Sequence, residues 1–158
     1  AEQGQLVVLA SGPEEARGRC EAVGGKTVWL GEAGEGSRLK LVVNNWIVGL
    51  LGVLAETVAF ARATGVDPKK FLETIEGGPL GLPYAQIKGA MMIEEDYPTS
   101  FSARLARKDA ALVLEAARAR DLDLAVASAV AARFDDAIGA GHGDQDMAAV
   151  YEATKPER

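Results

Sequence analysis

Two residues that could transfer and orient a proton, a lysine and an asparagine, lie four positions apart at the start of a predicted helix. Lys40 and Asn44 follow a glycine-rich stretch at residues 31–36. Residues four apart project from the same face of a helix. A lysine there is unusual, because the helix macrodipole disfavours positive charge in the first turns by about 0.3 to 1 kcal/mol. The pair is suited to an acid/base group beside an orienting amide.

The same stretch admits two other interpretations. Its glycines suggest a dinucleotide fingerprint, but the third glycine is missing, and Glu32 and Glu35 would repel a pyrophosphate. We therefore reject a dinucleotide fingerprint at this position. The residue types alone also allow Lys40 to be an ordinary solvated lysine, with Asn44 hydrogen-bonded to neighbouring backbone.

Before this stretch, the sequence predicts a strand, a helix and a second strand. Residues 5–10 and 27–30 are β-type apolar runs, and residues 13–23 form a modest helix between them. This spacing is typical of one crossover unit in a parallel sheet. Two strands do not make a sheet that is stable alone. The chain also opens at Ala1 without a methionine, so we expect that a preceding domain supplied the other strands.

After residue 34, the apolar spacing predicts helices only. A helix over residues 39–64 would span on the order of 40 Å, which predicts a central helix wrapped by others. We expect Leu105, Leu112 and Ala116 to point inward, and Asp144 to cap the last helix. The other predicted helices lie at residues 68–76, 83–94, 102–120, 124–138 and 145–153. Small residues allow the central helix to approach a partner helix closely, namely Gly49, Gly52, Ala55 and Ala59.

Composition excludes several classes of function. The 158 residues carry a net charge of −6 without a run of Lys or Arg, so we expect no nucleic-acid partner. One cysteine, Cys20, and one histidine, His142, give no zinc-ligand set, so we expect no metal site. The longest apolar run, residues 46–55, is about half a membrane span. We therefore expect no membrane contact. The single cysteine cannot form an intrachain disulfide, which favours the reducing cytoplasm.

The pattern Gly34-x-Gly36-x-x-x-Lys40-x-x-x-Asn44 resembles the catalytic motif of the β-hydroxyacid dehydrogenases, the family that includes 3-hydroxyisobutyrate dehydrogenase and semialdehyde reductases. Three further segments agree in order. Residues 1–6 look like the last part of the family's nucleotide-binding domain. Phe101 with residues 105–109 resembles its second lysine motif, and residues 141–146 resemble the turn before its last helix. The resemblance covers essentially the whole chain.

By position, the resemblance assigns roles to six residues. Lys40 would be the catalytic lysine, which protonates the carbonyl oxygen in reduction and removes the hydroxyl proton in oxidation. Asn44 would orient Lys40 or the substrate. The implied cofactor-binding residues are Gly36, Phe101, Lys108 and Asp109. Val43 departs from the family, since 3-hydroxyisobutyrate dehydrogenases tend to have Asn and 6-phosphogluconate dehydrogenase has His there. This departure argues against phosphogluconate as the substrate.

The resemblance also implies a mainly α fold and a set of partners. Residues 31–158 would form the all-helical C-terminal dehydrogenase domain around one long central helix, and residues 1–30 a β-α-β remnant of a Rossmann domain. The cofactor would be NAD or NADP, bound mostly by the missing N-terminal domain, and the substrate a small hydroxy acid or semialdehyde. The implied assembly is a homodimer or higher homo-oligomer. The chain alone would be an inactive fragment.

Three alternatives remain open at this point. Some proteins of this fold have lost the lysine and act as non-catalytic dimerisation or scaffold modules, and the presence of Lys40 and Lys108 favours the enzyme. An amine-forming reductase generally uses another residue at the position of Lys40. An unrelated helical domain with fortuitous lysines would leave the ordered agreement of four segments unexplained.

Overall fold

The computed structural model describes residues 7–23 and 25–155 of the chain. They belong to two compact units, Ala1–Asn44 and Asn45–Arg158. Over these residues the predicted mainly α fold is confirmed, with one short sheet at the N-terminal side. The family segment expected at residues 1–6 lies outside the described residues. The predicted domain boundary after residue 30 stays a prediction.

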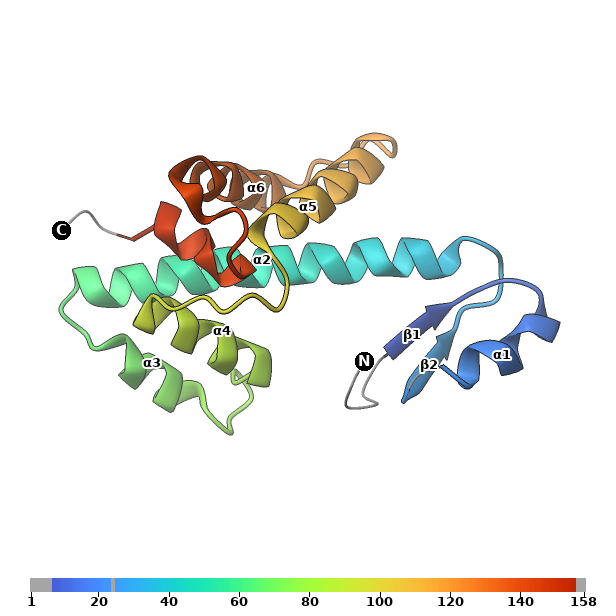
Figure 1. Ribbon diagram of the computed structural model, residues 1–158, viewed down its shortest axis with the longest axis horizontal. Coiled ribbons are helices and arrows are strands. Elements are labelled where there is room, and N and C mark those ends of the chain that lie inside the picture. The colour runs from blue at the N-terminus through green and yellow to red at the C-terminus, as the bar shows by residue number, and fades with distance from the viewer. Residues whose placement is uncertain (1–6, 24, 156–158) are drawn as a thin grey trace. The chain divides into compact units, whose positions relative to one another are not determined.

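The first unit contains the predicted crossover (Figure 1). Strands β1 (Val7–Ala10) and β2 (Lys26–Trp29) pair in parallel, with Val7 opposite Lys26 and Ala10 opposite Trp29. Between the strands lie a 3-10 turn, η1 (Glu14–Ala16), and a short helix, α1 (Arg17–Glu21).

Helix α2 (Glu35–Ala63) is the predicted long helix, and it begins four residues earlier than expected. It ends at Ala63, and Gly65, two residues later, takes a left-handed φ of 76°. By length and apolar composition alone α2 could cross a membrane. Leu51, Ala55 and Val58 are nevertheless fully buried in the core of the second unit. We therefore interpret α2 as a core helix.

The second unit places the remaining helices around the C-terminal part of α2 (Figure 1). Helices α3 (Pro68–Ile75) and α4 (Pro83–Glu94) pack together, as do α5 (Ala103–Arg118) and α6 (Ala125–Ala137). A π-helical turn, η2 (Ile138–His142), and a 3-10 helix, η3 (Met147–Ala153), close the unit. The largest fully buried apolar side chains are Leu51, Val58, Met92, Phe134, Val150 and Tyr151.

The buried face of α5 differs from the predicted one. Leu105 and Leu112 were expected to point inward, but they are 46% and 42% exposed. The buried residues are instead Ala103, Ala106, Ala110, Val113 and Ala117. Small side chains on this face let α5 approach α6 closely, and this contact outweighs the greater hydrophobicity of the leucines.

The cap of the last helix also differs from the prediction. Asp146, rather than Asp144, accepts a hydrogen bond from the backbone N–H of Ala148 at 3.0 Å. Asp144 is exposed and forms an ion pair with Arg104 at 3.3 Å. The helix begins later than predicted because Lys88 and Ser100 hold the Asp146 side chain in the core.

The small residues of α2 serve the chain's own packing. A Cβ atom at Gly52 would overlap the side chain of Val130 on α6, and Ala55 and Ala59 are buried. At Gly49, by contrast, a Cβ would meet nothing within 4 Å. Of the four small residues expected to face a partner helix, three therefore lie in the core of the second unit.

Candidate functional site

The predicted catalytic pair lies near the start of α2. Lys40 is exposed, and Asn44, one helical turn further on, is buried with 7% exposure. Arg38, the other cation at this helix start, forms an ion pair with Glu35 at 3.4 Å. Lys40 forms no ion pair with any residue that the structure describes.

Gly36 lies where the first turn of α2 meets the end of β1. Its backbone N–H donates a hydrogen bond to Ser11 Oγ at 3.1 Å. A Cβ atom at this position would lie 2.9 Å from the carbonyl oxygen of Leu9. Because a backbone atom cannot move away cheaply, only glycine fits this contact. The structure thus gives Gly36 a packing role, and its expected role at the cofactor stays a prediction.

The second predicted group, from Phe101 to Asp109, lies at the start of α5. Phe101 is half-buried, packs against the core, and precedes the N-cap residue Ser102, whose Oγ accepts from the N–H of Leu105 at 3.3 Å. Lys108 is exposed on α5 and, within residues 7–23 and 25–155, has no ion-pair partner. Asp109 is half-buried. The Phe101 ring thus lies just before α5, and the Lys108 side chain is exposed on α5.

A buried ion pair that the sequence did not predict supports this group. Lys88 Nζ lies 2.7 Å from Asp146 Oδ1, and the two residues are 3% and 0% exposed. Asp146 Oδ2 accepts hydrogen bonds from the Ser100 N–H at 3.1 Å, the Ser100 hydroxyl at 2.8 Å and the Phe101 N–H at 3.4 Å. Two features of the sequence could have indicated this pair. One is a lysine within the apolar helix α4, and the other is the aspartate at the end of the motif at residues 141–146.

These contacts set the protonation state of Asp146. Burial raises the pKa of its carboxyl group, whereas the hydrogen bonds from Lys88, Ala148 and Ser100 lower it. The net result is a pKa below the ordinary value for aspartate. Asp146 is therefore a buried carboxylate balanced by a buried ammonium group.

A second charged network joins the C-terminal ends of α2, α4 and η3. Glu95 accepts hydrogen bonds from Arg62 at 2.7 Å and from Lys155 at 2.8 Å. The hydrogen bonds from Lys155 and Arg62 lower the pKa of Glu95 to about 2. His142 lies at its edge, with Nε2 3.7 Å from Glu152 Oε2. We assign this network to the folding of the unit rather than to chemistry.

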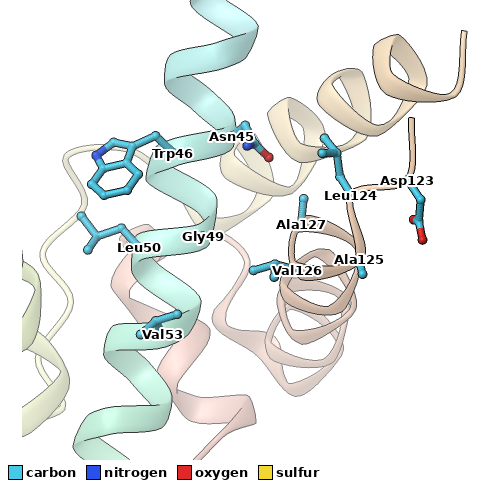
Figure 2. Close-up of a pocket in the computed structure, with 10 residues that line it drawn as sticks. All are labelled: Asn45, Trp46, Gly49, Leu50, Val53, Asp123, Leu124, Ala125, Val126 and Ala127. Carbon is cyan, nitrogen blue, oxygen red and sulfur yellow. The ribbon is translucent and has the colours of Figure 1, made fainter. Parts of the chain in front are cut away.

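An apolar groove runs along α2 in the second unit. Its volume is about 550 Å³, and Figure 2 shows its lining residues on α2 on one side and on residues 123–127 on the other. Trp46 and Val126 are both 61% exposed, and Val53 is 57% exposed. None of the predicted catalytic or cofactor-binding residues lines the groove. Its apolar lining is suited to packing rather than to acid/base chemistry.

Comparison with known proteins gives consistent similarities. Residues 34–154 match the family described as the NAD-binding domain of NADP-dependent 3-hydroxyisobutyrate dehydrogenase. The chain is 33% identical over 159 residues to glyoxylate/succinic semialdehyde reductase 2, chloroplastic, of Arabidopsis thaliana, covering 98% of this chain and 44% of the relative. It is 31% identical over 162 residues to reductase 1 of the same plant, covering 100% of this chain and 56% of the relative.

The similarity to a solved structure indicates the same family as the similarity to the sequence relatives. The fold is similar to the crystal structure of 3-hydroxyisobutyrate dehydrogenase from Salmonella typhimurium, with a TM-score of 0.85 and 25% identity. The match covers 96% of this chain and 55% of that chain. The chain thus spans about half the length of the curated relatives it matches. The predicted family resemblance of the chain is confirmed.

Proposed function

We propose, since the chain belongs to the NAD(P)-dependent 3-hydroxyisobutyrate dehydrogenase family, that it is the C-terminal domain of an enzyme acting on a small β-hydroxy acid or semialdehyde. In this proposal residues 31–158 form the helical domain, and residues 1–30 end an N-terminal Rossmann domain. The protein containing both domains is termed the parent protein below. We further propose a cytoplasmic location, which the free thiol of Cys20 favours.

The observation that carries this proposal is the exposed Lys40, which has no ion-pair partner among the described residues and lies one helical turn before the buried Asn44. In reduction, Lys40 Nζ donates a proton to the carbonyl oxygen of the substrate. In the reverse reaction, neutral Lys40 accepts the proton of the hydroxyl group. Asn44 orients Lys40 or the substrate and transfers no proton. The hydride adds to the carbonyl carbon and the proton to the carbonyl oxygen, which together give the alcohol.

Phe101, just before α5, and Lys108, on α5, fit a nicotinamide cofactor. A half-buried aromatic ring at Phe101 offers a flat surface to a nicotinamide or its amide, and Lys108 offers a cation to a negative charge. A bound NAD(P) supplies the hydride in reduction and accepts it in oxidation. Gly36 and Asp109 complete the proposed cofactor-binding residues. The choice between NAD and NADP would lie with the N-terminal domain.

A second copy of the chain is the proposed occupant of the apolar groove. Trp46, Val53 and Val126 are large, exposed and close together along it. A homodimer would remove them from water. Light scattering at tens of micromolar chain should give the dimer mass, and Trp46→Glu should give the monomer. Ala132→Glu, at an exposed position of α6 outside the groove, is the matched control. A monomeric unmodified chain would contradict the dimer.

The experiment for the enzymatic function uses the purified parent protein. NADPH or NADH oxidation is followed with succinic semialdehyde and with glyoxylate, the substrates named for the plant relatives. We expect saturable turnover of at least one small semialdehyde or related oxo acid with one of the two cofactors. A parent sequence without a glycine-rich strand–helix turn, or a folded parent without turnover, would contradict the proposal.

A further inference from the structure

The main chain of Phe101 is held on both sides by the segment that starts η3. Its N–H donates to Asp146 Oδ2 at 3.4 Å, and its carbonyl oxygen accepts from the N–H of Met147 at 2.8 Å. The next residue but one, Ala103, donates its N–H to the carbonyl oxygen of Gln145 at 2.9 Å. The position of Phe101 and the start of α5 is therefore fixed by residues 145–147.

Asp146 is the centre of this arrangement. Its side chain is fully buried, and every described partner is a donor: the Lys88 ammonium, the Ser100 hydroxyl and the N–H groups of Ser100, Phe101 and Ala148. Only an ionised carboxylate accepts from all of these groups. An amide at this position would turn its NH₂ toward another donor.

Lys88 neutralises the buried negative charge of Asp146. Its ammonium lies 2.7 Å from Asp146 and 5.5 Å from the centre of the Tyr84 ring. The free energy needed to remove both charges from water offsets most of the electrostatic attraction between them. Apolar residues of the same size therefore often stabilise a core equally well. Stability alone therefore gives a poor reason for this pair. Its distinctive property is geometric, because the carboxylate holds two consecutive backbone N–H groups just before α5.

We propose that Asp146, with Lys88 as its counter-ion, is a positioning residue for the cofactor site. It fixes the main chain of Ser100 and Phe101, and thereby the Phe101 ring and the first turn of α5. This inference rests on the proposed function, in which Phe101 and Lys108 contact the nicotinamide cofactor. Neither Asp146 nor Lys88 touches the cofactor in this account.

The first test measures the positioning on this chain by amide hydrogen exchange. Lys88→Met removes the counter-ion and keeps much of the stem. Ser100→Ala removes the hydroxyl bond to Asp146 and the hydrogen bond that Lys88 Nζ donates to Ser100 Oγ at 3.3 Å, while the ion pair stays, so it is the milder variant. In both variants the amides of residues 100–103 should exchange on the order of 10-fold faster, while those of α6 stay unchanged. Ser128→Ala, at an exposed site on α6, is the control. Unchanged exchange at 100–103 in both variants would overturn the proposal.

The second test is a double-mutant cycle in the parent protein, read by the Kd of NADPH or NADH from fluorescence titration. Phe101→Ala and Lys88→Met should each raise the Kd on the order of 10-fold. If Asp146 acts through Phe101, Lys88→Met should change the Kd less than about 2-fold in the Phe101→Ala background. The melting temperature should fall on Lys88→Met in both backgrounds, because the buried Asp146 carboxylate loses its counter-ion whether or not the Phe101 ring is present.

The outcomes separate the two proposals. If Phe101→Ala raises the Kd but the two effects multiply, the pair acts on cofactor binding by a route other than Phe101; if Lys88→Met lowers the melting temperature and leaves the Kd unchanged, it acts on stability alone. Either result overturns the positioning role. If Phe101→Ala leaves the Kd unchanged, Phe101 is not part of the cofactor site, and the proposed site assignment fails together with the positioning role. If Lys88→Met unfolds the parent, the same cycle is measured with Ser100→Ala.

Discussion

Replacing Gly52 by alanine should destabilise the chain, although alanine is the better helix former. A Cβ atom at Gly52 would overlap Val130 Cγ2 and lie 3.1 Å from Cγ1 and 3.2 Å from Cβ of the same residue. Rotation of Val130 about χ1 moves its methyl groups but leaves its Cβ in place. Val130 is also buried, with 7% exposure. Helices α2 and α6 must therefore separate to admit the new methyl group.

Gly49, on the same helix, is the matched control when both variants are made in the Trp46→Glu background, which is expected to be monomeric, because within the described chain a Cβ at Gly49 would meet nothing within 4 Å. Both substitutions gain about 1 kcal/mol from helix propensity. This gain cancels when the two variants are compared. What remains is the cost of overpacking a close-packed core, about 1 to 3 kcal/mol. The free energy of unfolding of Gly52→Ala should therefore lie below that of Gly49→Ala by this amount.

Urea unfolding followed by far-ultraviolet circular dichroism measures the difference. In thermal melts, the same difference corresponds to about 2 to 4 °C per kcal/mol for a chain of this size. Adding Val130→Ala to Gly52→Ala should relieve the clash, so the two substitutions should couple favourably. Equal free energies for Gly52→Ala and Gly49→Ala would refute the described contact between α2 and α6.

Two further predictions concern acid stability and cofactor binding. The hydrogen bonds from Lys155 and Arg62 lower the pKa of Glu95 from 4.5 to about 2. The unfolded chain therefore takes up the proton first, and the stability due to Glu95 should be lost as pH falls from 4.5 toward 2. Melting temperatures across this window should fall less for Glu95→Gln than for Glu94→Gln, and equal falls would exclude this role. In calorimetry, this chain alone should show no saturable binding of NADPH or NADH at micromolar concentration. The reason is that the phosphate-binding loop is expected in the N-terminal domain. Binding with a micromolar Kd would show that the chain itself holds the main cofactor site.

Local chemistry explains where the sequence predicted the fold well. Asp67 followed by Pro68 starts α3, and Asp67 caps it through the N–H of Lys69 at 2.9 Å. Pro83 starts α4, and its end at Glu94 matches the prediction. Caps and proline at the first helical position act over a few residues, so one sequence is sufficient to place them. The i,i+4 relation of Lys40 and Asn44 followed from spacing in the same way.

Contacts between distant residues explain what the sequence did not predict. Lys88 and Asp146 are 58 positions apart, and neither residue type indicates its partner. The same long-range pair moved the cap of η3 from Asp144 to Asp146. On α5, the alanine face was buried in place of Leu105 because close helix packing is a tertiary property. The roles of Lys40, Asn44, Gly36, Phe101, Lys108 and Asp109 stay predictions.

The turnover of Lys40→Met in the parent protein tests the central proposal most directly. The substitution removes the proton donor and keeps most of the side-chain volume at an exposed site, so the melting temperature should change little. With a semialdehyde that the parent reduces, kcat should fall on the order of 100-fold or more, the usual contribution of a general acid. Lys40→Arg should fail as well, because a guanidinium group does not release its proton at working pH, and Asn44→Ala should lose less. A Lys40→Met enzyme that retains most of its kcat would show that Lys40 is an ordinary surface lysine.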